Sequence, residues 1–333
     1  MKTIDLESHF LTPTWQAALA TNTGFPKVDA ARGLGFAEDA WMPLTATENK
    51  LADLADYRLG LMDEAGVDYA VVSLTSPGAE QFPPDVAKKV ASDANDYLAA
   101  AMKKHPDRIG GFASLAPKDA DWSAVELERC VKELGFKGWN THSNFGDSYL
   151  DEKRYWPILA KAEELNIPIY LHPAVPMIKE LREFGMVLGG PTLGFGTDVT
   201  YCFMRMIVRG VFDEYPNLKI IMGHLGEALP FLVDRVNRAW MQKHETPNPE
   251  IGPGSKEPAG YYLKKNLWVT TSGNYLPAAF YCTRDAIGMD KILLGTDFPY
   301  EHMNDCMDYL RSLPLTDDEA YALFEGNAKA LGF

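Results

Sequence analysis

The sequence predicts one (β/α)8 barrel over residues 1–333, with loop insertions on the catalytic face. Three observations predict this fold class. Short apolar runs rich in β-branched residues alternate with stretches of helical periodicity, which is the pattern of parallel strands joined by crossover helices. Eight such runs occur along the chain, the number of strands in a barrel of this type. No Pro-, Gly- or Ser-rich linker divides the 333 residues into two domains.

The expected elements follow one another in a regular order. The strands are expected at Thr3–Leu6, Tyr69–Leu74, Ile109–Leu115, Lys137–Asn140, Pro168–Leu171, Lys219–Met222, Leu267–Thr271 and Lys291–Leu294. The helices are expected at Glu48–Ala65, Pro84–Lys104, Ser123–Leu134, Arg154–Leu165, Val199–Glu214, Ala228–Met241, Ala278–Ile287 and Asp317–Ala330. An open doubly wound sheet is the main alternative, but no glycine-rich nucleotide motif follows any of the expected strands.

Three longer segments interrupt this alternation and are expected to be insertions. They are Phe10–Thr47 after the first strand, Pro173–Asp198 after the fifth strand and Gln242–Gly260 after the sixth helix. Active sites of such barrels lie on the loops that follow the strands. The first two insertions are therefore expected on the catalytic face.

Composition excludes several classes of partner. The formal net charge of −14 repels phosphate backbones, so no nucleic-acid partner is expected. The four cysteines form no CxxC motif, which fits a reducing compartment better than a disulfide framework. Asp5 and Glu7 interrupt the N-terminal stretch where a signal peptide needs apolar residues, and the longest uncharged run, Asn266–Thr283, contains Gly and Pro. We expect a cytoplasmic protein without a membrane partner.

Potential metal ligands occur where the expected strands end. Glu7 and His9 follow the first strand, His172 ends the fifth, His224 the sixth and Asp297 the eighth. Glu7 and His9 are two residues apart, so in extended backbone they share one face. A lone histidine at a strand end is more often structural, but five such residues at four strand ends favour a site for one divalent metal ion. Imidazole and carboxylate ligands suit Zn²⁺, Mn²⁺ or Fe²⁺.

A His–Glu pair adds proton-transfer chemistry to this set. His224 and Glu227 are spaced i, i+3 at the opening of an expected helix, where the carboxylate can raise the basicity of the imidazole. A purely structural interaction at the helix start is the alternative. His142, after the fourth strand, is a candidate substrate contact, with an ordinary loop role as its alternative. No G-x-S-x-G motif or cysteine nucleophile motif supplies a covalent mechanism.

The segments E-S-H, YLHP, GHLGEALP and GTDFP together resemble the amidohydrolase superfamily. The similarity is to the decarboxylase branch with γ-resorcylate, 2,3-dihydroxybenzoate and 5-carboxyvanillate decarboxylases, and it runs nearly end to end. The resemblance implies that one Zn²⁺ or Mn²⁺ is bound by Glu7, His9, His172 and Asp297, with His224 and Glu227 beside it. Hydrolases of the superfamily usually begin with H-x-H, so Glu in the first position favours carbon–carbon cleavage.

The resemblance also implies a substrate class, a small aromatic carboxylic acid. An ortho-hydroxybenzoate would lose CO₂ after protonation at the carbon that bears the carboxylate, by Asp297 or by a water relayed through His224 and Glu227. Arg235 matches an arginine that binds a substrate carboxylate in carboxyvanillate-type enzymes, whereas a second arginine of that group has no counterpart in Trp41–Lys50. Phe298 and Tyr300 are expected to line the ring pocket.

Several alternatives stay open at this point. The same metal site could hydrolyse a lactone or amide, hydrate an unsaturated dicarboxylic acid, or serve as a non-catalytic scaffold. Related enzymes form dimers or tetramers, so we expect a homodimer or homotetramer.

Overall fold

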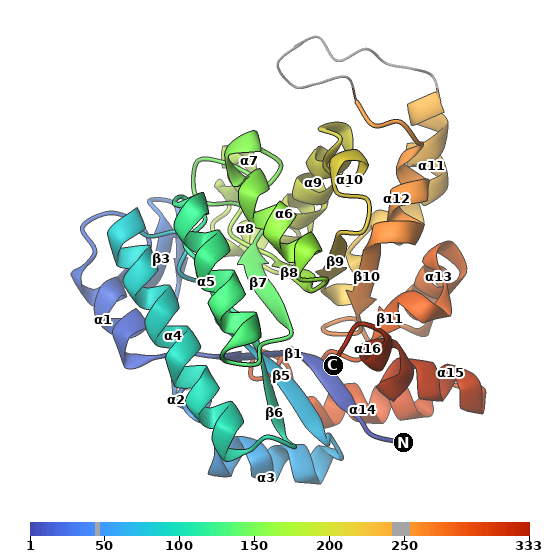
Figure 1. The fold of residues 1–333 in the computed structure, drawn as a ribbon, viewed down its shortest axis with the longest axis horizontal. Coiled ribbons are helices and arrows are strands. Elements are labelled where there is room, and N and C mark those ends of the chain that lie inside the picture. The colour runs from blue at the N-terminus through green and yellow to red at the C-terminus, as the bar shows by residue number, and fades with distance from the viewer. Residues whose placement is uncertain (44–46, 242–253) are drawn as a thin grey trace.

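The computed structural model describes residues 1–43, 47–241 and 254–333, and its centre is a barrel of parallel strands (Figure 1). All eight strands of the barrel fall where the sequence predicts them, so the predicted (β/α)8 fold is confirmed. In spatial order they are β1 (Ile4–Phe10), β5 (Tyr69–Leu74), β6 (Ile109–Ala113), β7 (Gly138–His142), β8 (Pro168–His172), β9 (Lys219–Met222), β10 (Leu267–Thr270) and β11 (Ile292–Leu293).

The first and last strands close the barrel through backbone hydrogen bonds. Leu6 N donates to Leu294 O at 2.9 Å, and His9 N donates to Phe298 O at 2.8 Å. The pairing with β1 thus extends past the end of β11 into the segment that contains Asp297. The backbone N of Asp297 donates to Glu7 O at 2.8 Å. Two of the predicted metal ligands are thus held together by the closing seam of the barrel.

Helices surround the barrel on its outer side (Figure 1). They are α1 (Pro13–Thr21), α2 (Thr47–Ala52), α3 (Asp56–Ala65), α4 (Pro84–Lys104), α5 (Ala120–Lys132), α6 (Trp156–Glu164), α7 (Lys179–Arg182), α8 (Met186–Gly189), α9 (Gly194–Val208), α10 (Val211–Glu214), α11 (Leu229–Met241), α12 (Ala259–Asn266), α13 (Pro277–Ile287), α14 (Met303–Ser312), α15 (Asp317–Tyr321) and α16 (Asn327–Ala330). None of the helices that the structure describes has the length and apolarity needed to cross a bilayer.

Three predicted helices are divided in the structure. The expected helix Val199–Glu214 is α9 and α10, separated at Gly210, whose φ of 75° is in the left-handed region. The expected helix Glu48–Ala65 is α2 and α3, because the Asp53 carboxylate accepts hydrogen bonds from the backbone N of Ala55 and of Arg58 and starts a new helix. The expected helix Asp317–Ala330 is α15 and α16, joined by a π-helical turn at Ala322–Gly326. The sequence prediction also missed α12 and α14, as well as α1, α7 and α8 within the insertions.

Two apolar layers position the site. One fills the barrel interior and contains Ile4, Leu6, Val71, Phe112, Tyr170, Ile221 and Leu293. The larger one lies between the strands and the surrounding helices. Because the interior is packed with side chains, a ligand can enter only at an end of the barrel.

Two of the predicted insertions lie at the carboxyl ends of the strands. Phe10–Thr47 contains α1 and a small antiparallel sheet of β2 (Lys27–Asp29), β3 (Gly33–Ala37) and β4 (Ala40–Met42), which the sequence analysis did not foresee. Pro173–Asp198 contains α7 and α8. Residues from both insertions line cavities there. Residues 44–46 of the first insertion and 242–253 of the third, Gln242–Gly260, lie outside the described residues.

Candidate active site

Four of the predicted ligands meet at the closing seam of the barrel. Ligand atoms of Glu7, His9, His172 and Asp297 all lie within 4.8 Å of one another. The four residues are between 1% and 9% exposed. Acidic side chains are rarely buried to this degree unless a cation or a hydrogen-bond donor compensates them. The strand ends predicted that these four side chains would converge together with His224, and the family resemblance singled out the four.

A bulge in β1 aims Glu7 and His9 at this point. From the pair Asp5–Ala70 to the pair Ser8–Val72, β1 advances three residues while β5 advances two. Before the bulge, the even positions Ile4 and Leu6 belong to the apolar layer inside the barrel. The extra residue reverses which side chains of β1 face the barrel interior. After the bulge the odd-numbered residues Glu7 and His9 face inward.

The donor atoms of Glu7 and His172 fit a divalent cation. Glu7 Oε1 is buried without a hydrogen-bond partner, while its Oε2 accepts a hydrogen bond from Thr270 Oγ1 at 2.6 Å. His172 Nδ1 lies 3.0 Å from Pro173 O, which leaves Nε2 as the ligand atom. Burial, together with the neighbouring histidines, holds the pKa of His172 well below its usual value, so the imidazole is neutral as a metal ligand must be.

Glycines make room for the Glu7 carboxylate. A Cβ at Gly223 would lie 2.9 Å from Glu7 Oε1, and a Cβ at Gly295 would lie 2.9 Å from Glu7 Oε2. No other residue could bring its backbone so close to the carboxylate. The glycines before His224 and Asp297 are therefore part of the site.

His9 and Asp297 complete the cluster. His9 Nδ1 lies 3.1 Å from Ser73 Oγ, and His9 Nε2 lies 2.9 Å from Asp297 Oδ1. Burial opposes ionisation of Asp297, but the imidazoles of His224 and His9 outweigh it and lower the pKa of this carboxyl below its usual range. Asp297 is thus an anion beside two imidazole rings.

His224 and Glu227 stand beside the cluster as a hydrogen-bonded pair. His224 Nδ1 lies 2.9 Å from Glu227 Oε1, and His224 Nε2 lies 3.9 Å from Asp297 Oδ2. Burial disfavours the imidazolium, yet Asp297 and Glu227 raise the pKa of His224 well above its usual value. The proton of this group is therefore held between two carboxylates.

The local backbone at this pair differs from the prediction. His224 belongs to a 3-10 turn, His224–Gly226, and α11 begins only at Leu229, so Glu227 is not in the first turn of that helix. His224, Glu227 and Asp297 have φ values of 55°, 55° and 56°, in the left-handed region that non-glycine residues rarely adopt. Such strain concentrates at functional sites, where the surrounding structure maintains it.

These groups open into a cavity of about 460 Å³ at the end of the barrel. It is lined by Phe36, Met42, Ser76, His172, Pro173, Pro191, Phe195, His224, Glu227, Gly273, Asn274, Asp297, Tyr300 and Glu301. Tyr300, a predicted substrate contact, is among them. Its hydroxyl is hydrogen-bonded to Thr75 Oγ1.

The structure does not bring three other predicted substrate contacts to this cavity. His142 is 1% exposed, and its Nδ1 lies 3.2 Å from Glu80 Oε1 behind His172. Phe298 is buried, with its ring 5.0 Å from the Arg58 guanidinium carbon. Arg235 is exposed on α11. Proximity in sequence to a strand end did not place His142 and Phe298, and the family resemblance did not place Arg235.

Sequence reasoning also missed several lining residues. Phe36 and Met42 come from the small sheet, Pro191 comes from the segment just before α9, and Phe195 comes from the first turn of α9. Only tertiary packing brings these segments over the barrel. Glu301 had a usable signal, because it lies four residues beyond Asp297 in the same strand-end loop.

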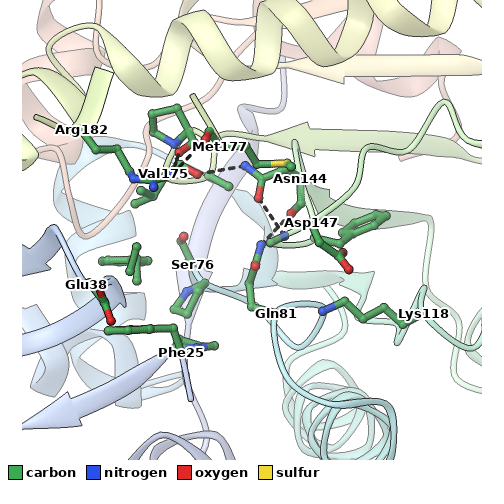
Figure 2. A pocket seen from close by; sticks show the side chains of 18 residues that line it. Phe25, Glu38, Ser76, Gln81, Lys118, Asn144, Asp147, Val175, Met177 and Arg182 are labelled. Atoms are coloured by element: carbon green, nitrogen blue, oxygen red, sulfur yellow. Dashed lines mark hydrogen bonds between the residues drawn. The ribbon is translucent and has the colours of Figure 1, made fainter. Parts of the chain in front are cut away.

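A second cavity of about 410 Å³ adjoins the first and shares Phe36 and Ser76 with it. Figure 2 shows Lys118 and Arg182 on opposite sides of this second cavity. Arg182 is engaged, since its Nε donates to Asp39 Oδ1 at 2.9 Å and its Nη1 donates to Pro176 O at 2.7 Å. The two cavities therefore differ in charge, because among the described residues only the second has lysine and arginine side chains in its lining.

A (β/α)8 barrel with a histidine–carboxylate cluster at its carboxyl end defines the class of metal-dependent barrel enzymes. Within that class the assignment is specific. The family model described as amidohydrolase matches residues 4–331, and the chain belongs to this family.

Individual relatives cover nearly the whole chain. γ-Resorcylate decarboxylase of Polaromonas sp. (strain JS666) is 34% identical over 98% of this chain and 97% of its own. 5-Carboxyvanillate decarboxylase of Novosphingobium aromaticivorans, solved with manganese and 4-hydroxy-3-methoxy-5-nitrobenzoic acid, superposes with a TM-score of 0.88 at 32% identity, covering 99% of this chain and 95% of that one. Dihydroxybenzoic acid decarboxylase of Polaromonas sp., solved with manganese and 2-nitroresorcinol, superposes with a TM-score of 0.84 at 32% identity. The match covers 99% of this chain and 96% of that one.

Proposed function

We propose that this protein is a non-oxidative carboxy-lyase that uses one divalent metal ion to release CO₂ from an ortho-hydroxy aromatic carboxylic acid. The buried Glu7, His9, His172 and Asp297 cluster, open to a cavity beside the His224–Glu227 pair, carries this proposal. The relatives support it, because two are decarboxylases of hydroxybenzoates at about a third identity over nearly the full chain.

The four clustered residues would hold the ion. Two imidazoles and two carboxylates suit Mn²⁺ or Zn²⁺, and the manganese of the relatives favours Mn²⁺. When bound, the ion supplies positive charge that orients the phenolate and carboxylate of the substrate. The unpartnered Glu7 Oε1 is the observation in this chain that a cation would satisfy.

Decarboxylation exchanges a carbon–carbon bond for a carbon–hydrogen bond. A proton adds to the ring carbon that bears the carboxylate, the bond to the carboxylate carbon breaks, and its electron pair restores the aromatic ring as CO₂ leaves. His224 stores the proton, because two carboxylates raise its pKa. Asp297 faces both His9 and His224 and lines the cavity, so it passes the proton to the ring carbon.

The cavity also fixes the ring. Phe36, Met42 and Phe195 give it apolar walls, and Tyr300 closes the side toward His9, with ring centroids 5.7 Å apart. Apolar walls exclude water from the site of proton transfer and favour the flat face of an aromatic substrate.

Reconstitution with Mn²⁺ or Zn²⁺, followed by ultraviolet and CO₂-release assays with γ-resorcylate, 2,3-dihydroxybenzoate and salicylate, tests the proposal. Metal-dependent CO₂ release from a hydroxybenzoate is the expected result. Simple lactones are assayed in parallel, and lactone opening without CO₂ release from any acid would contradict it.

We further propose a cytoplasmic homodimer or homotetramer. Exposed apolar side chains such as Phe231 on α11, at 79%, and Val187 on α8, at 72%, support self-association. The four cysteines are free thiols, which supports a reducing compartment. Light scattering of the purified protein measures the oligomeric state, and cell fractionation tests the cytoplasmic location.

A further inference from the structure

Apart from the phenol of Tyr300, the titratable side chains around the catalytic cavity are acids and histidines. They are His172, His224, Glu227, Asp297 and Glu301. No lysine or arginine lines this cavity among residues 1–43, 47–241 and 254–333. From the described residues, the positive charge available to a ligand in this cavity is therefore that of a bound metal ion, together with the imidazolium of His224.

Glu301 differs from the other carboxylates of the cavity because its acceptor atoms are free. Asp297 faces His9 at 2.9 Å, and Glu227 faces His224 at 2.9 Å. The Glu301 carboxylate makes no hydrogen bond or ion pair with any described residue. It is partly buried, and its Oε1 lies 4.0 Å from where a Cβ of Gly273 would be, on the His224 side of the cavity.

The nearest basic side chains are directed elsewhere. The guanidinium of Arg58 is fully buried behind β1, where it donates to Ser8 Oγ and to His9 O. Lys118 and Arg182 line the adjoining cavity shown in Figure 2, with Phe36 and Ser76 at the boundary between the two. A second anionic group on a substrate held at the metal site would thus face Glu301 without a cation to neutralise it.

We propose that Glu301 is a specificity residue that accepts a hydrogen bond from a second ring hydroxyl and rejects a second carboxylate. The inference rests on the proposed decarboxylase function and narrows it to dihydroxybenzoate-type monocarboxylates. A hydroxyl donor satisfies the free acceptor, whereas two carboxylates sharing a poorly solvated site repel each other. The relatives include enzymes named for a dihydroxybenzoic acid and for a carboxyvanillate.

Three coloured nitrophenols test the proposal by binding rather than turnover. In each, the nitro group stands for the carboxylate that is lost as CO₂. 2-Nitrophenol is the reference compound, 2-nitroresorcinol adds one hydroxyl, and 4-hydroxy-3-nitrobenzoic acid adds one carboxylate. Each is titrated into the Mn²⁺-loaded protein, and the dissociation constant is taken from the visible absorption change. Relative to the reference, we expect 2-nitroresorcinol to bind about tenfold more tightly and 4-hydroxy-3-nitrobenzoic acid about tenfold more weakly.

The substitution Glu301→Gln tests the residue itself, with manganese content measured for every variant. It should reduce both differences to about threefold or less, because the amide neither repels a carboxylate nor retains the full acceptor strength. Asp305→Asn is the matched control. It removes the same charge from an exposed residue of α14 outside the cavity and should leave all three constants unchanged.

Two results in the unsubstituted protein would overturn the inference even if the Glu301 variant failed to fold. One is binding of 4-hydroxy-3-nitrobenzoic acid at least as tight as that of the reference. If Lys118→Met then abolished that binding, the second carboxylate would be shown to reach the adjoining cavity. The other is equal binding of 2-nitroresorcinol and 2-nitrophenol. CO₂ release from hydroxybenzoates alongside either result would leave the proposed function standing, whereas absence of both CO₂ release and nitrophenol binding would remove both proposals.

Discussion

At the scale of single residues, His224 and Asp297 have opposite electrostatic roles although they are neighbours. Two carboxylates raise the pKa of His224, and two imidazoles lower the pKa of Asp297. The proton therefore rests on the histidine while the aspartate remains an anion able to bind metal. Replacing His224 and Asp297 one at a time therefore distinguishes an effect on proton transfer from an effect on metal binding.

Replacing His224 by Asn tests proton handling. His224 is outside the four-residue cluster, so the variant should retain its metal. Its turnover should fall by about 10²–10⁴-fold, the usual contribution of a positioned acid or base. Metal content by atomic spectroscopy and the rate of CO₂ release are measured on the same preparation. Turnover like that of the unsubstituted enzyme would show that His224 does not handle the proton.

Replacing Asp297 by Asn should instead reduce metal content and rate together. The amide oxygen is a weaker ligand than the carboxylate, and the amide cannot accept the proton of His224. We expect metal affinity to fall at least about tenfold. Full metal occupancy with an unchanged rate would refute the assignment of Asp297 as a ligand.

The sequence allowed these residues to be identified because strand ends of a parallel barrel converge. Glu7, His9, His172 and Asp297 are ligand-type residues at such ends, and the structure brings them together. The same reasoning failed for His142, whose side chain lies behind His172 and bonds to Glu80. Position along a strand gives the end of the barrel, but not which side chain reaches the open cavity.

At the scale of elements, the bulge in β1 depends on helix α3. Arg58 of α3 donates from one guanidinium nitrogen to Ser8 Oγ and from another to His9 O, and its plane packs over the Phe298 ring. These contacts fix Ser8 and His9, the two residues of β1 that resume the regular pairing with β5 after the bulge. The arginine thus orients His9 from behind the strand without touching the cavity.

Replacing Arg58 by Met should loosen the bulge. Ser8 Oγ and His9 O would lose buried donors, so we expect the free energy of unfolding to fall by about 3 kcal/mol. The apparent affinity for Mn²⁺ should fall about tenfold, because His9 is no longer held in place. Urea unfolding and metal titration are the measurements. Arg108→Met, which breaks a surface pair with Asp63, is the control and should change stability by less than about 1 kcal/mol. A metal affinity unchanged by Arg58→Met would contradict the positioning role.

Neither the bulge nor the small sheet could be predicted from the sequence. A bulge changes the pairing register by one residue. The segment IDLESHF could form either a regular or a bulged strand, so its sequence does not reveal the bulge. The strands β2, β3 and β4 are three to five residues long and partly exposed, so they lack the sustained alternation that marks a strand. The eight barrel strands, by contrast, are buried runs that the helices enclose on one side.

At the scale of the whole molecule, the metal centre acts as a clamp across the seam that closes the barrel. Glu7 and His9 come from the first strand and Asp297 from the segment after the last, some 290 residues away. Tying such distant segments stabilises the folded state only while the ion is bound. Removal of the metal should therefore weaken the fold as well as the activity.

The pH dependence of this effect follows from the carboxyls beside the seam. Burial raises the pKa of Asp5 to about 7, despite hydrogen bonds from Thr296, and burial also raises the pKa of Glu7. A carboxyl with a folded pKa above its unfolded value stabilises the protein at low pH, and this contribution is lost as the pH rises through the folded pKa. Metal-depleted protein should thus lose stability between about pH 4 and pH 7.

Manganese should oppose that loss, because a cation binds the ionised carboxylate and gains affinity as the pH rises. At a hundred times its dissociation constant, the ion adds about 2.7 kcal/mol to the free energy of unfolding. Urea unfolding at about pH 5, 6 and 7.5, with chelator or with Mn²⁺, measures both effects, and we expect the two curves to diverge as the pH rises. In the metal-depleted protein, the Asp5→Asn substitution should reduce the dependence of the free energy of unfolding on pH. If the free energy of unfolding changed with pH in the same way with and without the ion, the metal would not stabilise the closing seam. Binding to a carboxylate that titrates in this range must make the two pH profiles diverge.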